Sequence, residues 1–232
     1  MANINIKAVI FDMDGVLIDS EPAWQKAEMA VMNSLGLKLT FEDVESTTGY
    51  RIDQVVDYWY QRFPWANYNN AETASQIVQA VAEHIRLDGE PMEGVIDTLK
   101  DCRHKGLKIG LATSSPSLII DAVLTRLGIS EHFDAICSAE HLALGKPHPE
   151  VYLNCAKKLA VDAVNCLAIE DSFNGLIAAR AANMQTIAIP APQVAQQTKW
   201  VVGHHQISPK KISPNFIPQV FANQRMNGLV RN

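Results

Sequence analysis

The sequence predicts an α/β fold with a Rossmann-like parallel sheet core, helices on both faces of the sheet, and an inserted all-helical cap domain. First, short apolar runs alternate with helical patterns from Gly94 onward, which is typical of a parallel sheet. Second, the block from Leu17 to Asp88 has helical periodicity and no alternating strand pattern. Third, this block follows the short apolar run Lys7–Ile10, which reads as a buried strand. The helical block is therefore expected to interrupt the sheet domain after its first strand.

The amino-acid composition is that of a globular protein, and it argues against some classes of binding partner. The 232 residues are 47% hydrophobic and 19% charged, with a formal net charge of −5, which argues against nucleic-acid binding. No apolar run approaches the length of a membrane helix, and the N-terminus lacks the pattern of a signal peptide. The four cysteines are scattered without a Cys-x-x-Cys pair, so we expect buried packing residues. We therefore expect a cytoplasmic protein without a membrane partner.

The cap is expected at residues 18–88, with three helices. The first begins near Pro22, carries apolar residues at helical spacing and ends at Gly36. The second runs from Ile52 to Phe63, where Pro64 stops it, and the third covers Ala71 to Leu87.

The catalytic core is expected at residues 1–17 and 89–203. Its helices are expected at 95–105, 116–127, 149–159 and 173–182. Its further strands are expected at 107–112, 133–137, 164–169 and 185–189. From Pro190 the chain is rich in proline, and we expect residues 204–232 to form an irregular C-terminal tail. The sequence leaves open whether this end is a loose tail or an irregular but packed segment, and we expect truncation after about Gly203 to preserve activity.

Polar side chains follow the ends of the predicted strands. Asp12 and Asp14 follow the first strand, Thr113 and Ser114 the second, and Glu170 and Asp171 the fourth, while Lys146 precedes a helix. Because parallel strands place their carboxyl ends at one edge of the sheet, these groups are expected to converge.

Such a set suits phosphoryl transfer, which depends on positioning and on neutralising charge. Carboxylates of Asp12, Glu170 and Asp171 suit Mg²⁺, and Lys146 supplies a cation. Each motif also has a purely structural reading. Asp14 can belong to an Asp-Gly turn, Lys146 to a surface turn, and the other groups can cap the helices that follow them.

Taken together, the motifs resemble those of the haloacid dehalogenase superfamily, in its β-phosphoglucomutase-like branch. Four motifs occur in the family's order, with a helical insert between the first two: Asp12-Met13-Asp14-Gly15-Val16, Thr113, Lys146-Pro147 and Glu170-Asp171. The tract Ser172-Phe173-Asn174-Gly175 also matches that branch. The resemblance covers residues 6–192, and four motifs in register make it specific.

The resemblance implies a role for each of these residues. Asp12 would be the nucleophile that forms an aspartyl-phosphate, and Asp14 the general acid and then base. Dehalogenases of the superfamily lack the acid at this second position, so Asp14 points to a phosphatase or mutase. Thr113, Ser114 and Lys146 would bind phosphate. The Mg²⁺ ion, for which Mn²⁺ can substitute, would be bound by Asp12, the Asp14 carbonyl and Asp171, with Glu170 nearby.

The cap decides between the remaining functions. Glu21, Trp24 and Arg51 are candidate substrate residues, and Arg51 follows Thr47-Thr48-Gly49-Tyr50, which resembles the branch's specificity loop. For Trp24, stacking on a sugar and packing in the cap core stay equally open.

Stretches such as Ile18-Asp19-Ser20-Glu21-Pro22 resemble sugar-phosphate phosphatases that act on hexitol and 2-deoxyhexose 6-phosphates. We therefore expect a monomeric phosphatase of a small phosphorylated sugar or polyol. The alternatives are a hexose-phosphate mutase and, more remotely, a non-enzymatic sugar-phosphate-binding module.

Overall fold

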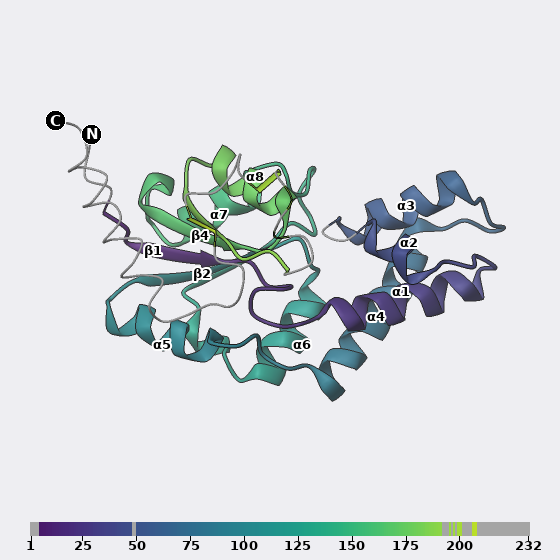
Figure 1. The fold of residues 1–232 in the computed structure, drawn as a ribbon, viewed down its shortest axis with the longest axis horizontal. Helices are drawn as coiled ribbons and strands as arrows, with labels where there is room; N and C mark the ends of the chain where they lie inside the picture. Colours follow the sequence, from purple (N-terminus) through teal and green to yellow (C-terminus); the bar gives the residue numbers. More distant parts are fainter. Residues whose placement is uncertain are drawn as a thin grey trace.

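The computed structural model describes residues 5–47, 50–191, 195, 197, 199–200 and 206–207. In Figure 1 an α/β core with a central sheet lies on the left, and a group of helices lies on the right. Two connections link these parts, and they run side by side where Ile18 and Pro91 form an antiparallel bridge. The cap and core boundaries at 17/18 and 88/89 stay a prediction.

The sheet is parallel and has six strands in the order β3-β2-β1-β4-β5-β6. Their bounds are β1 Ala8–Phe11, β2 Lys108–Thr113, β3 Ala135–Ser138, β4 Cys166–Glu170, β5 Gln185–Ala188 and β6 Gln206–Ile207. The first strand, β1, is central and pairs with both β2 and β4. The ends of these three strands therefore meet at one edge, as the sequence predicts.

Helices cover both faces of this sheet. In Figure 1, α5 (Val95–His104) and α6 (Ser117–Leu127) lie below it, and α7 (Glu150–Lys158) and α8 (Phe173–Ala181) lie above it. Alternate residues of β1 face opposite sides: Val9 and Phe11 belong to one apolar cluster, and Ala8 and Ile10 belong to the other. Because all four are buried, β1 reads as a continuous apolar run. Two one-turn 3₁₀ helices, Ser130–His132 and Ala163–Asn165, precede β3 and β4.

The cap contains α1 (Glu21–Ser34), α2 (Phe41–Glu45), α3 (Ile52–Arg62) and α4 (Asn70–Asp88). The sequence predicts the three longer helices but not α2. That short helix is specified by a capping box, in which the Thr40 side chain accepts from the Asp43 N–H and the Asp43 carboxylate accepts from the Thr40 N–H. Helix α4 also packs against α6 of the core, so the cap is tied to the sheet domain through a helix pair.

The C-terminal segment departs from the expected irregular tail at one described place, and a residue just before the tail is also packed. Gln206 and Ile207 form β6 and pair with β5. Trp200, only 2% exposed, packs with Leu176 and Ala188. The sequence did not predict this strand, because two residues among prolines are too few to show a periodic pattern. Truncation after Gly203 would therefore remove the edge strand β6, and the retention of activity after that truncation stays a prediction. The rest of 204–232 lies outside the described residues.

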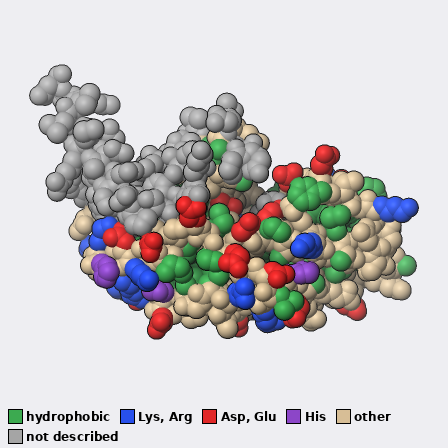
Figure 2. All heavy atoms as spheres, turned by 60° about the horizontal axis from the view of Figure 1, so that its bottom comes forward, with side chains coloured by type: hydrophobic (Ala, Val, Ile, Leu, Met, Phe, Trp, Pro, Cys, Tyr) green, Lys and Arg blue, Asp and Glu red, His purple; other side chains and the backbone are tan. Residues whose placement is uncertain are grey.

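None of the helices that the structure describes is long and apolar enough to cross a membrane. On the face shown in Figure 2, acidic and basic side chains of the described residues are interspersed. That face offers no continuous basic surface, in keeping with the net charge of −5.

Candidate active site

A buried ion-pair triad lies at the end of β1. The Lys146 ammonium donates to Asp12 Oδ1 and to Glu170 Oε1, each at 2.6 Å, and to the Ala112 carbonyl at 3.0 Å. The side chains of all three charged residues are at most 9% exposed. Burial tends to lower the pKa of Lys146, but Asp12 and Glu170 raise it overall, so its ammonium stays charged. The structure thus brings together three of the residues singled out from the sequence.

Glu170 is held by four donors, two on each carboxylate oxygen. Oε1 accepts from Lys146 and from the Tyr152 hydroxyl, and Oε2 accepts from the Ser172 N–H and hydroxyl. Ser172 also caps α8, since its hydroxyl accepts from the Gly175 N–H. A carboxylate engaged in this way orients the Lys146 ammonium firmly toward Asp12.

Asp12, Glu170 and Asp171 form an acidic cluster in which one oxygen from each lies within 4.8 Å of the others. Burial, together with Glu170, raises the pKa of Asp12 to about 8, although Lys146 opposes the rise. Burial and the charges of Asp12 and Glu170 likewise raise the pKa of Asp171 well above its ordinary value. Excess buried negative charge with oxygen ligands fits a divalent cation such as Mg²⁺ or Mn²⁺.

Two glycines make room for these carboxylates. A Cβ at Gly15, where φ is +71°, would lie 2.0 Å from Asp171 Oδ2, and one at Gly175 would lie 1.7 Å from Glu170 Oε1. Both contacts are far inside van der Waals distance, so no side chain fits at either position. The glycines of the first and last motifs therefore allow the backbone to approach the acids closely.

Asp14 is clamped by three side-chain donors. Its Oδ1 accepts from the Ser20 hydroxyl at 2.5 Å and from the Trp24 indole N–H at 3.1 Å, while Oδ2 accepts from the Ser115 hydroxyl at 2.6 Å. One donor lies on the connection to the cap, one on the cap helix α1, and one beyond β2 in the core. The position of Asp14 thus depends on both parts of the molecule.

Thr113 and Ser114 lie at the carboxyl end of β2, as expected. Thr113 is buried, and its hydroxyl oxygen accepts from the Ser115 N–H at 3.0 Å. The Thr113 hydroxyl thus shapes the turn before α6, and its phosphate-binding role stays a prediction, as does that of Ser114.

The structure adds contacts for each candidate cap residue. Glu21 accepts a hydrogen bond from Gln25 at 2.9 Å, and the Trp24 indole contacts Asp14 rather than lying only within the cap core. Arg51 pairs with Asp53 and donates to the carbonyls of Ala139 and Leu142 in the core, at 3.3 and 2.7 Å. Arg51 is therefore a bridge between cap and core. Thr48 and Gly49 of the specificity-loop sequence lie outside the described residues.

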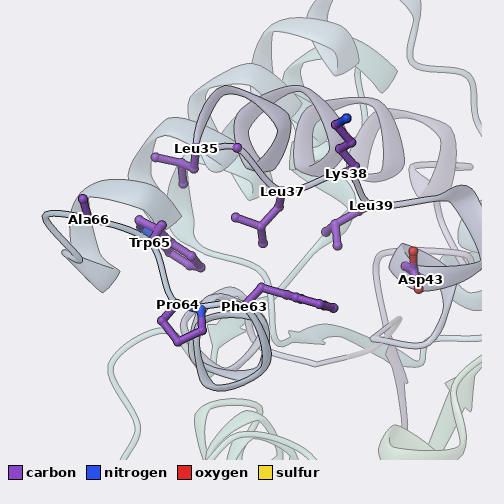
Figure 3. A pocket seen from close by; sticks show the side chains of 10 residues that line it. Leu35, Leu37, Lys38, Leu39, Asp43, Phe63, Pro64, Trp65 and Ala66 are labelled. Atoms are coloured by element: carbon purple, nitrogen blue, oxygen red, sulfur yellow. The ribbon is translucent and has the colours of Figure 1, made fainter.

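A separate hollow lies at the far end of the cap and does not belong to this site. It has a volume of about 420 Å³ and lies between the turn after α1 and the turn after α3 (Figure 3). Apolar side chains such as Leu37, Phe63 and Trp65 make up most of its wall, beside Lys38 and Asp43. Although an apolar pocket is a common first guess for a ligand site, this one lacks the converging acids that surround Lys146.

Sequence reasoning missed three hydroxyl residues that complete the site: Ser20, Ser115 and Tyr152. Ser115 stands in the same Thr-Ser-Ser run as Thr113 and Ser114, and Ser20 directly precedes the first cap helix, where a serine is common. No motif signal marks Tyr152, because a tyrosine on an amphipathic helix looks like a core residue.

Comparisons with known proteins agree with this geometry. The family model described as haloacid dehalogenase-like hydrolase matches residues 9–189. Hexitol phosphatase B of Escherichia coli K12 is 43% identical over 204 residues, covering 88% of this chain and 92% of the relative. Fructose-1-phosphate phosphatase YqaB of the same strain is 32% identical, covering 78% of this chain and 95% of the relative. The crystal structure of β-phosphoglucomutase from Clostridium difficile superposes with a TM-score of 0.80 at 25% identity, covering 97% of this chain and 100% of that one.

Proposed function

Because the chain belongs to the haloacid dehalogenase-like hydrolases, we propose that it is a metal-dependent phosphatase of small sugar and sugar-alcohol phosphates. Hexitol and 2-deoxyhexose 6-phosphates are the favoured substrates, and Asp12 is the nucleophile. The observation that carries the chemistry is the pairing of Asp12 with Lys146 at 2.6 Å next to the clamped acid Asp14. This combination supplies a nucleophile, a neutralising cation and a proton donor in one place.

The reaction follows from the atoms of these residues. Lys146 engages Asp12 Oδ1, which leaves the second oxygen of the carboxylate to attack phosphorus. The ester P–O bond breaks, and Asp14 donates a proton to the departing sugar oxygen. Asp14, now a carboxylate, takes a proton from the water that attacks the acyl phosphate; inorganic phosphate leaves and Asp12 is restored. Thr113, Ser114 and Lys146 would bind the phosphoryl oxygens.

A divalent cation fits the acidic cluster. Asp12 and Asp171 would hold it, with the Asp14 carbonyl, while Glu170 is engaged by its four donors and stays nearby. Bound there, the cation would neutralise charge on the transferring phosphoryl group. Mg²⁺ is the expected metal, and Mn²⁺ is a substitute.

Hydrolysis is favoured over a mutase reaction, although the fold is shared with a β-phosphoglucomutase. Both curated relatives named above are phosphatases by name, and one of them is 43% identical to this chain. A mutase must deliver the phosphoryl group to a second sugar hydroxyl, and should therefore be primed by a hexose bisphosphate. A monomeric state and a cytoplasmic location remain predictions.

A substrate panel tests the proposal. Phosphate release is measured with glucitol 6-phosphate, 2-deoxyglucose 6-phosphate, fructose 1-phosphate and a nucleoside monophosphate, with Mg²⁺ and with a chelator. We expect Mg²⁺-dependent release from the hexitol and hexose phosphates. Absence of release from every ester, combined with isomerisation of glucose 1-phosphate after bisphosphate priming, would replace the phosphatase with the mutase.

A further inference from the structure

One face of helix α1 carries a polar strip that begins at the active site. Glu21, Trp24, Gln25 and Glu28 are spaced three and four residues apart, so their side chains are neighbours on one face of the helix. The Trp24 indole donates to Asp14 at 3.1 Å, which places this strip beside the proton donor of the reaction. The Gln25 amide donates to the Glu21 carboxylate at 2.9 Å, and Gln25 is itself buried.

Glu28 is the unusual member of this strip. It is 6% exposed, and its Oε2 has no hydrogen-bond partner within the part of the chain that the structure describes. A buried carboxyl oxygen without a partner costs free energy, and native structures contain few of them. Because Glu28 lies on the same face of α1 as Trp24, which contacts Asp14, this atom is a candidate for a position that a ligand completes.

The charge state of Glu28 indicates which ligand group fits. Burial, and to a lesser extent the Glu21 carboxyl, raise the pKa of Glu28 to about 8. Near pH 7 the group is therefore mainly a neutral carboxylic acid, which can donate one hydrogen bond and accept others. A hydroxyl group has the same dual capacity, whereas an ammonium group would prefer a carboxylate.

We propose that Glu21, Gln25 and Glu28 form a subsite for the hydroxyl groups of the substrate carbons farthest from the phosphate, with Glu28 as the specificity-determining residue. The inference rests on the proposed phosphatase function. Glu28 lies one helical turn beyond Trp24, about 6 Å along the axis at 1.5 Å per residue. A six-carbon polyol phosphate extends far enough from Asp14 to reach Glu28, and a three-carbon ester does not.

The test compares two esters in variants of Glu28. In Glu28→Leu we expect kcat/KM for glucitol 6-phosphate to fall roughly 10–100-fold, mainly through KM, while kcat/KM for glycerol 3-phosphate stays within about twofold. Glu28→Gln, which keeps a donor and an acceptor, should retain most of the activity. Lys26→Met, on the exposed side of α1, is the matched control.

Three results would contradict the proposal that Glu28 binds substrate hydroxyl groups. One is an equal loss on both esters in a variant with a lowered melting temperature, which would make Glu28 a structural residue. Another is unchanged kinetics in Glu28→Leu. The last is a preference of the wild-type enzyme for glucosamine 6-phosphate over glucose 6-phosphate.

Calorimetric titration with glucitol 6-phosphate separates the two proposals. If wild-type protein hydrolyses neither ester, the phosphatase proposal fails on its own. Binding that is weakened roughly tenfold or more in Glu28→Leu, but not in Lys26→Met, would still support the subsite, and equal binding by all three proteins would reject it.

Discussion

The rim of the candidate active site, formed by Asp12, Asp14, Lys146 and Glu170, differs from the polar strip of helix α1 in how its buried polar groups are hydrogen-bonded. At the rim, Lys146 lies between Asp12 and Glu170, and Glu170 accepts from four donors. On α1, Glu28 is equally buried, yet Oε2 has no partner among the described residues. The hydrogen bonds around Lys146 and Glu170 suit a site that receives the same phosphoryl group from every phosphate ester. The cap leaves hydrogen-bonding capacity open for the part of the substrate that differs between esters.

The largest effect should come from replacing the proposed nucleophile, Asp12. Asp12→Asn keeps the size of the side chain but removes the attacking carboxylate, so kcat for glucitol 6-phosphate should fall by about a thousandfold or more. Phosphate release measures this loss. A folded Asp12→Asn protein, as judged by its melting temperature, that retains most of its activity would assign the nucleophile elsewhere.

Removing the Lys146 ammonium should lower the free energy of unfolding as well as the activity. Lys146→Met leaves Asp12 and Glu170 buried side by side without their partner, so we expect the free energy of unfolding to fall by about 3–5 kcal/mol. Urea denaturation measures the change, with the exposed Lys157→Met as control. Equal stability of the two variants would show that the triad contributes little to folding.

Removing the hydrogen bond from Trp24 of the cap to Asp14 should have an intermediate effect on activity. Trp24→Phe keeps an aromatic ring but removes the N–H that donates to Asp14 Oδ1, so kcat should fall roughly tenfold. Trp65→Phe, in the distal part of the cap, should leave kcat unchanged. If both variants behave alike, the indole hydrogen bond does not position the acid.

Loosening the cap at its second contact with the core should have a smaller effect. Arg51→Ala removes the hydrogen bonds to Ala139 and Leu142, so KM should rise by about fivefold as the cap is held less firmly against the core. Arg62, at the other end of α3, packs over Tyr58 instead, so Arg62→Ala serves as control. A large fall in kcat with little change in KM would instead place Arg51 in the chemical step.

A separate prediction concerns the charge state of Glu28 and is measured as protein stability rather than as activity. The folded-state pKa of Glu28 is about 8 against an ordinary value of 4.5, so the folded protein holds a proton that the unfolded chain has lost in this range. The free energy of unfolding should therefore decline as pH rises between these values, by at most about 1.4 kcal/mol per pH unit. The difference between wild type and Glu28→Gln, measured by urea denaturation at pH 5 and pH 8, isolates this contribution. A difference that does not change with pH would mean that Glu28 is ionised in the folded state.

Much of the fold and the rim could be predicted from the sequence because both rest on local patterns. Apolar runs such as Lys7–Ile10 and the acids that directly follow them share one stretch of chain, and parallel pairing of β1, β2 and β4 brings their ends together. The family resemblance was confirmed by the match over residues 9–189. The proposed roles of the individual site residues await the experiments above.

What the sequence did not reveal depends on side-chain direction. Serines at helix starts are common, so nothing local indicates that Ser20 and Ser115 both donate to Asp14. Tyr152 reaches Glu170 only because α7 packs over the sheet. Helix α2 and strand β6 are too short for a periodic signal, and their stability comes from a capping box and from pairing with β5.

If Asp12 accepts the phosphoryl group during the reaction, that group can be trapped on it. The Asp14→Asn variant is mixed with p-nitrophenyl phosphate, whose leaving group departs without a proton, in the presence of Mg²⁺. We expect a burst of about one p-nitrophenolate per protein and, by mass spectrometry after acid quench, a phosphoryl group on the peptide that contains Asp12. Steady turnover by wild-type protein without any phosphorylated peptide in the variant would contradict it.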